Sequence, residues 1–79
     1  MQKIYVMDCT DMIFDALILQ ARGSHFFHGE IEMEIGDLFV NVEYRKDKIY
    51  TGRIAIEEII DIFPKSQITV VATIVKNTS

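Results

Sequence analysis

The clearest pattern along the chain is a strict alternation of glutamate and apolar residues in positions 30–35, followed by a second alternating stretch at 38–44. Gly36 and Asp37 stand between the two stretches, and a Gly-X pair suits a two-residue type II′ turn. A one-residue slip would move every apolar side chain to the other face, so the register is strongly specified. The pattern predicts a β-hairpin that pairs Ile35 with Leu38, Met33 with Val40 and Ile31 with Val42.

The stretch before this hairpin carries the signals of a helix. Thr10 is a good N-cap, Asp11 falls in the first turn, and Arg22 falls in the last turn before Gly23. The residues between are apolar on nearly all sides, so periodicity alone does not separate a helix from a buried strand. The capping residues favour a helix over residues 11–22.

A second helix is predicted near residues 56–63, where apolar residues follow the spacing i, i+3, i+4, i+7 and Pro64 marks the end. The start of this helix is open, because residues 49–56 also suit a strand with Tyr50, Ile54 and Ile56 on one face. Residues 3–8 and 67–76 are rich in isoleucine and valine and are predicted to be strands.

The predicted elements follow the order strand, helix, strand, strand, helix, strand. That is the βαββαβ order of the ferredoxin-like fold, an α+β antiparallel sheet with two helices on one face. In this arrangement residues 30–35 form an edge strand, which the three glutamates would protect from pairing with another chain. The alternative is a mostly-β meander with one helix, in which residues 14–21 and 49–56 are strands.

The composition fits one small globular domain spanning residues 1–79. The chain is 49% hydrophobic and 25% charged, and Cys9 is its only cysteine, so it forms no intrachain disulfide. A core of this size supplies only about 3–5 kcal/mol unless something else stabilises the fold. Self-association is therefore an expected source of additional stability.

The charge pattern and the N-terminal residues bear on location and partners. The formal net charge of −4 disfavours binding to polyanions, so nucleic acid is an unlikely partner. No apolar run approaches the roughly 20 residues of a membrane helix, and the N-terminal residues lack the layout of a signal peptide. We expect a cytoplasmic protein without a membrane partner.

Candidate catalytic chemistry is limited to three residues. His25 and His28 could bind a metal ion together with Cys9 or a nearby carboxylate, but a third ligand cannot be placed. Cys9 precedes the predicted helix, a position that lowers the pKa of a thiol, although Asp8 and Asp11 oppose the thiolate. The alternative function is thus a small metal-dependent or thiol enzyme that uses His25, His28 and Cys9. We expect no cofactor.

One short stretch resembles a nucleic-acid-binding family. Phe39-Val40-Asn41-Val42 is similar to the end of the aromatic strand motif of RNA-recognition domains, which share the ferredoxin-like order. The leading basic residue is missing and Val42 replaces an aromatic residue. The resemblance implies a weak RNA-recognition-like binder as a further alternative.

The predicted fold leaves one sheet face uncovered. Ile4, Val6, Val40 and Val42 would face the helices, and the opposite face would carry apolar side chains in the open, a common mark of interfaces. We expect a non-enzymatic interaction module that forms a homodimer or binds a protein partner through this face. The candidate interface residues are Tyr5, Met7, Phe39 and Val71, with Phe26 and Phe27 from the neighbouring loop.

Overall fold

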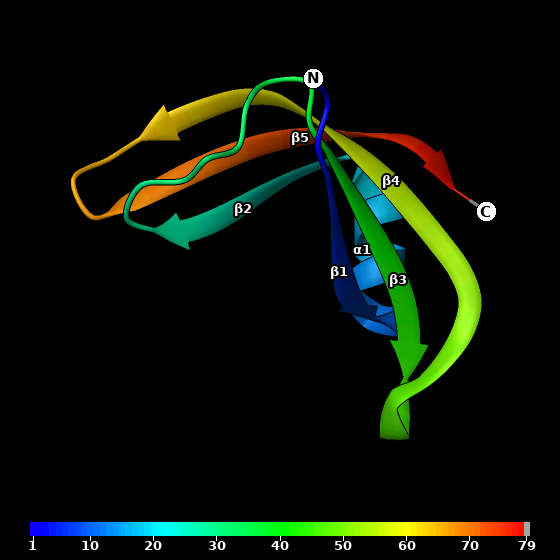
Figure 1. The fold of residues 1–79 in the computed structure, drawn as a ribbon. Coiled ribbons are helices and arrows are strands. Elements are labelled where there is room, and N and C mark those ends of the chain that lie inside the picture. The colour runs from blue at the N-terminus through cyan, green and yellow to red at the C-terminus, as the bar shows by residue number, and fades with distance from the viewer. Residues whose placement is uncertain (79) are drawn as a thin grey trace.

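A computed structural model describes residues 1–78 as one mixed sheet, strongly curled into a half-barrel, with a short helix packed against its inner face (Figure 1). The elements in chain order are β1 (Ile4–Thr10), α1 (Asp11–Gln20), β2 (Arg22–His28), β3 (Leu38–Arg45), the 3-10 turn η1 (Lys46–Lys48), β4 (Ile49–Pro64) and β5 (Ile68–Thr78). No helix in the described part of the chain is long and apolar enough to cross a membrane.

The sheet has the strand order β1-β3-β4-β5-β2, so β1 and β2 are its two edges. β1 runs parallel to β3, and every other neighbouring pair is antiparallel. The long strand β4 pairs with β3 along its first part and with β5 along its second, and Figure 1 shows it arching between the two halves of the sheet. This bend gives the sheet its curl.

The predicted ferredoxin-like fold is wrong. The described residues contain one α-helix of ten residues, and the sheet is mixed rather than antiparallel. The alternative of a mostly-β protein with one helix is closer to the structure, but a meander cannot contain the parallel pair of β1 and β3. That pair requires a crossover, which α1, β2 and residues 29–37 provide together.

The predicted hairpin of residues 30–35 with 38–44 is also wrong. Val40 pairs with Val6 on one side and with Ile56 on the other, so β3 has no free edge for a further strand. Residues 30–35 form no strand, and Ile31 and Met33 instead pack as side chains against the core. These two apolar residues of the alternating pattern therefore pack on the core, although the segment pairs with no strand of the sheet.

A turn does form here, but it lies one residue earlier than predicted, with Ile35 and Gly36 at its centre instead of Gly36 and Asp37. The N–H of Asp37 donates to the carbonyl of Glu34 at 3.1 Å, and Gly36 has a φ of 98°, which favours glycine. The carboxylate of Asp37 accepts from the backbone N–H groups of Glu34 and Lys3 at 2.9 and 3.0 Å. The turn thus ties residues 29–37 to the start of β1 rather than to a hairpin partner.

The second predicted helix is a strand, and its helix-like spacing combines apolar residues from the two faces of that strand. The pairing of β4 with β5 shifts register between Ile59 and Asp61. An extra residue in one strand changes which side chains point inward. Ala55, Glu57 and Ile59 are buried at a spacing of two, but the next core contact is Ile62, three residues further on. Ile59 therefore faces the core, whereas Ile60 and Phe63 of the predicted helical stripe are exposed.

The first predicted helix is confirmed, with a different C-terminal end. Thr10 is the N-cap, and its hydroxyl accepts from the N–H of Ile13 at 3.3 Å. The helix stops at Gln20 because Ala21 adopts the left-handed conformation with a φ of 60°. The chain then enters β2 at once, so Gly23 lies in a strand rather than ending the helix.

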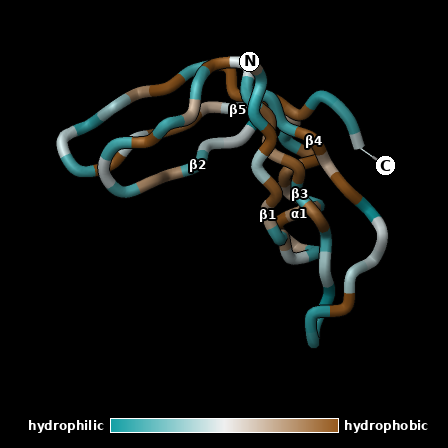
Figure 2. The backbone as a smooth tube through the Cα atoms, in the orientation of Figure 1, coloured by the Kyte–Doolittle hydropathy of each residue, from teal (hydrophilic) through white to brown (hydrophobic). Residues whose placement is uncertain are grey.

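The inner face of the sheet holds two apolar clusters. One consists of Cys9, Phe14 and Ala55, with Leu17 and Ile18 of α1 against it. The other is built on Phe39, Ile59 and Val71 and is covered by residues 29–37 through Ile31 and Met33. Figure 2 shows hydrophobic and hydrophilic residues interleaved along the strands, as a sheet with one inner and one outer face requires.

Candidate functional site

A buried polar group separates the two apolar clusters. The carboxylate of Glu57, on β4, is fully buried. Its Oε1 accepts from Nδ2 of Asn41 at 2.7 Å, and its Oε2 accepts from the hydroxyl of Thr73. Nε2 of His25 lies 3.0 and 3.1 Å from the two oxygens. We call these four residues, Glu57, His25, Asn41 and Thr73, the interior polar cluster.

Neighbouring strands position this cluster. Asn41, Glu57 and Thr73 lie on β3, β4 and β5, and each points inward at a central position of its strand. His25 comes from the edge strand β2 and packs its ring 4.8 Å from the ring of Phe39. The sheet order places these four strands side by side, so residues far apart in the sequence converge on one carboxylate.

Gly23 allows the backbone of β2 to approach the cluster closely. A Cβ at this position would lie 3.0 Å from Oε2 of Glu57 and 3.0 Å from Oγ1 of Thr73. Real Cβ atoms rarely come so close to other atoms. A side chain at this position would therefore force Glu57 or Thr73 to shift.

Glu57 is held in its charged form. Burial alone would raise the pKa of Glu57, but the hydrogen bonds from His25, Thr73 and Asn41 outweigh burial and hold that pKa below its ordinary value. Because an ionised carboxylate only accepts, Nε2 of His25 carries the proton that faces it. The cluster is fully satisfied, and no buried side-chain polar atom among the described residues lacks a partner.

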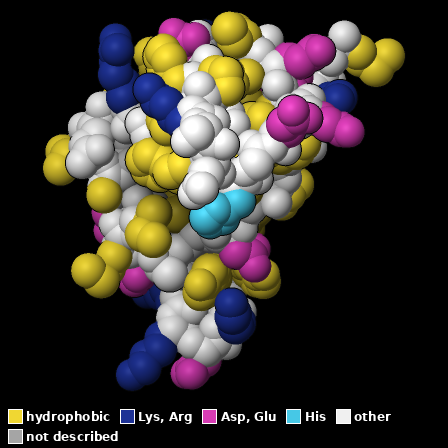
Figure 3. Space-filling view, turned by 90° about the vertical axis from the view of Figure 1, so that its left-hand side faces the viewer, with side chains coloured by type: hydrophobic (Ala, Val, Ile, Leu, Met, Phe, Trp, Pro, Cys, Tyr) yellow, Lys and Arg dark blue, Asp and Glu magenta, His cyan; other side chains and the backbone are white. Residues whose placement is uncertain are grey.

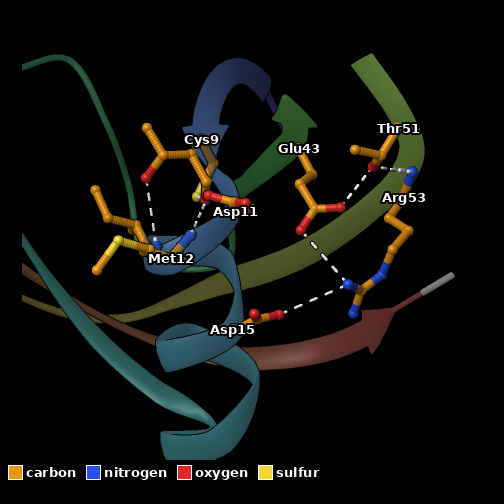
Figure 4. A network of polar contacts seen from close by, with 9 residues as sticks. Cys9, Asp11, Met12, Asp15, Glu43, Thr51 and Arg53 are labelled. Atoms are coloured by element: carbon orange, nitrogen blue, oxygen red, sulfur yellow. Dashed lines mark hydrogen bonds and ion pairs between the residues drawn. The ribbon is translucent and has the colours of Figure 1, made fainter. Parts of the chain in front are cut away.

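A second buried carboxylate connects the sheet to the helix. Glu43 on β3 accepts from the hydroxyl of Thr51, and its Oε2 lies 3.4 Å from Nη1 of Arg53. Arg53 also lies 3.6 Å from Asp15 of α1 and stacks its guanidinium 4.6 Å from the ring centre of Phe14. Figure 4 shows Arg53 reaching between Glu43 and Asp15. This contact holds α1 against the sheet.

The structure does not bring the three candidate catalytic residues together. His25 points inward, whereas His28 is exposed and, three positions away on the same strand, lies on the opposite face. No group of three or more potential metal ligands occurs in residues 1–78. Cys9 is buried, and burial, followed by the charges of Glu57 and Glu43, raises the pKa of its thiol. Those influences oppose formation of a nucleophilic thiolate.

The structure places most of the candidate interface residues in the interior. Phe39 and Val71 are fully buried, and Tyr5, Met7 and Phe27 pack around them in the second apolar cluster. Phe26, by contrast, points outward and is 66% exposed. The sheet face that carries Phe39 was predicted to be open, but the helix and residues 29–37 cover it.

The open face is the outer one. We define the outer patch as the apolar side chains at the centre of the outer face of β1, β3 and β4: Ile4, Val6, Val40, Val42, Ile54 and Ile56. Ile4 and Val6 are 60% and 71% exposed. Polar pairs flank the patch: Tyr50 donates to Asp8 at 3.2 Å, and Lys76 lies 3.4 Å from Glu58. The alternation of residues along the strands indicated which side chains share a face of the sheet, but it did not indicate which face would be covered.

The remaining sequence candidates lie away from these sites. Lys46 and Lys48 lie in the exposed turn η1, where Lys48 packs over the ring of Tyr44. The side chain of Phe39, which an RNA-recognition-like strand would present to a base, is fully buried. The sequence matches no protein-family model and no curated protein. Function must therefore be argued from this geometry alone.

Proposed function

We propose that the chain is a non-enzymatic interaction module that self-associates as a homodimer through the outer patch. The observation that carries this proposal is the area left exposed. The chain has 5545 Å² of accessible surface, whereas a compact folded protein of 9.1 kDa exposes about 4900 Å². The radius of gyration is 12.7 Å, against about 11.6 Å for a typical domain of this length.

The excess area is of the size that a dimer buries. A standard interface covers about 800 Å² on each partner, and the chain exposes about 600 Å² more than a compact monomer would. Figure 3 shows hydrophobic side chains distributed over one face of the molecule, between charged groups. Exposed apolar surface is costly in water, and burying it stabilises a complex by about 25 cal/mol per Å².

The outer patch has the layout of an interface. Its centre is uncharged, and its flanks carry the Asp8–Tyr50 and Glu58–Lys76 pairs, which is the arrangement of apolar core and polar rim found at protein interfaces. Two copies can meet through this one self-complementary surface by a two-fold axis, which gives the commonest type of oligomer. Sheet packing on sheet would bury Val6, Val40 and Ile56 of both copies.

Sedimentation equilibrium of the purified protein tests the proposal. We expect wild-type protein to have about twice the monomer mass of 9.1 kDa at micromolar concentration. Val6→Glu places a charge in the patch at a position that is already 71% exposed, so it should fold and weaken the dimer by about tenfold or more. Val6→Thr keeps the branched shape and should still form the dimer.

Met12→Glu is the matched control outside the patch, because Met12 lies on α1 and is 80% exposed. It should leave the dimer unchanged. A wild-type protein that is monomeric throughout, or a Val6→Glu variant that forms the dimer like wild type, would contradict the proposal.

A further inference from the structure

Strand β2 has one side without a partner. It is the last strand in the sheet order and pairs only with β5. The N–H of Val75 donates to the carbonyl of Ala21, and the N–H of Gly29 donates to the carbonyl of Gln67. In an antiparallel ladder such bonded positions alternate with positions whose backbone groups point the other way. The N–H and C=O groups of Arg22, Ser24, Phe26 and His28 therefore point to the free edge.

This edge lacks the usual protection against pairing. Natural edge strands are guarded by proline, lysine, inward charges or bulges. Strand β2 contains no proline and no lysine, aspartate or glutamate, its one arginine is the first residue, Arg22, and its pairing with β5 runs without a register shift. No hydrogen bond among the described residues reaches the outward backbone groups of Ser24 and Phe26. The edge is thus free to accept another strand.

A groove runs beside this edge. A pocket of about 200 Å³ lies between α1 and β2, and we call it the edge groove; it is lined by Ile13, Ala16 and Leu17 of the helix and by Arg22, Ser24 and His25 of the strand. Ile13 is 62% exposed. The volume suits one apolar side chain of leucine or phenylalanine size. A strand added to β2 would direct alternate side chains into this groove.

The charge at the groove selects the partner. Arg22 lines the groove and has no carboxylate within ion-pairing distance among residues 1–78, although the chain as a whole carries a net charge of −4. We propose that the edge groove binds an extended peptide segment of a partner protein by strand addition. An apolar side chain of that peptide occupies the groove, and a carboxylate lies near Arg22. This surface is separate from the outer patch.

The experiment uses the full chain to select from a display library of random decapeptides, and one enriched peptide is then synthesised with a fluorescent label. Fluorescence anisotropy measures its affinity for each variant. Ser24→Pro removes an outward-facing N–H, a change that an edge strand tolerates. We expect it to weaken binding by about tenfold or more, whereas Ser24→Ala, which keeps the N–H, stays within about twofold.

Two further variants test peptide binding without the Ser24→Pro substitution. Ala16→Arg fills the edge groove from the exposed helix surface and should also weaken binding. Arg22→Glu should reject the enriched acidic peptide and prefer the same peptide with lysine in place of its acidic residue. Both sites are exposed, and circular dichroism checks that each variant folds.

Three outcomes would overturn the proposal. The library could yield no enriched peptide, or the enriched peptide could bind Ser24→Pro and Ala16→Arg as it binds wild type. Ser24→Pro could instead abolish self-association in sedimentation, which would show that the edge pairs with a second copy of this chain. Because the outer-patch variant Val6→Glu does not alter the edge groove, failure of the dimer and failure of peptide binding are distinguishable.

Discussion

Glu57 is the side chain on which residues of three neighbouring strands converge. Its carboxylate is buried at the meeting point of four strands and is satisfied by His25, Asn41 and Thr73. A buried charge that is fully hydrogen-bonded does not necessarily add stability over an apolar residue, but removing one partner leaves the others unsatisfied. We therefore expect the interior polar cluster to disfavour other alignments of the four strands, because they would leave a buried charge without its partners.

Replacing Glu57 by glutamine tests this role. The amide keeps the shape of the side chain, but its NH₂ group cannot accept the hydrogen bonds that one carboxylate oxygen now accepts. We expect Glu57→Gln to lower the free energy of unfolding by about 1–3 kcal/mol in urea denaturation. Glu58→Gln is the control on the next position, because Glu58 faces outward in an exposed pair with Lys76 and should change stability by less than about 1 kcal/mol. Equal effects of the two changes would contradict this role.

At the scale of the elements, β4 depends on a local departure from regular strand geometry, and β2 depends on a residue without a side chain. The register shift in β4 between Ile59 and Asp61 changes the inward positions partway along the strand. Gly23 brings β2 against the buried carboxylate. These two features accompany the change of inward positions along β4 and the close packing of β2 on Glu57.

The substitution Gly23→Ala tests the close approach. The new methyl group would meet Glu57 and Thr73 at 3.0 Å each, and overpacking of this kind costs about 1–3 kcal/mol. We expect a lower urea midpoint, together with chemical-shift changes at the His25 ring in NMR spectra. Ser24→Ala, one residue along and exposed, should leave both unchanged. A Gly23→Ala variant as stable as wild type would show that β2 does not need this contact.

At the scale of the whole molecule, the interior is unusually polar for its size. Among the described residues, the six buried hydrophobic residues are matched by six buried polar or charged ones. Exposed large apolar residues occur on the outer patch, on α1 and also elsewhere, as at Phe26, Ile60 and Phe63. A small core and a large apolar surface together make association with another chain the expected route to stability.

The polar interior also makes stability depend on pH. Hydrogen bonds hold the pKa values of Glu57 and Asp37 below their ordinary values of 4.5 and 3.8. The unfolded chain therefore takes up protons first as the pH falls. The stabilisation from both carboxylates is present above those ordinary values and is lost as the pH drops through the lower pKa values of the folded protein.

Urea midpoints measured from about pH 7 down to about pH 3 check this expectation. The wild-type midpoint should fall below about pH 4.5, and Glu57→Gln should show a shallower fall because one of the two carboxylates is gone. An identical pH dependence in wild type and variant would contradict the assignment of a charged Glu57.

Sequence patterns located several local features but not their partners. The Thr10 cap and the helix that follows it depend on residues close together in the chain, and both form. A turn also forms beside Gly36, but one residue earlier than predicted. The hairpin was wrong because a segment packed on a core satisfies alternation equally well. The second helix was wrong because its i, i+3 spacing combined apolar residues from both faces of a strand. Nothing in the sequence predicted the interior polar cluster, apart from the position of Glu57 within an apolar stretch.

The sequence by itself determined a small globular domain, one capped helix, one tight turn and a set of strands with two distinct faces, because these follow from composition, capping and periodicity. Only the tertiary structure decided which face is covered, which strands form the edges and which residues meet at Glu57. These outcomes depend on contacts between residues such as His25 and Glu57, 32 positions apart. Such contacts form only when the curl of β4 and the placement of α1 bring the strands together.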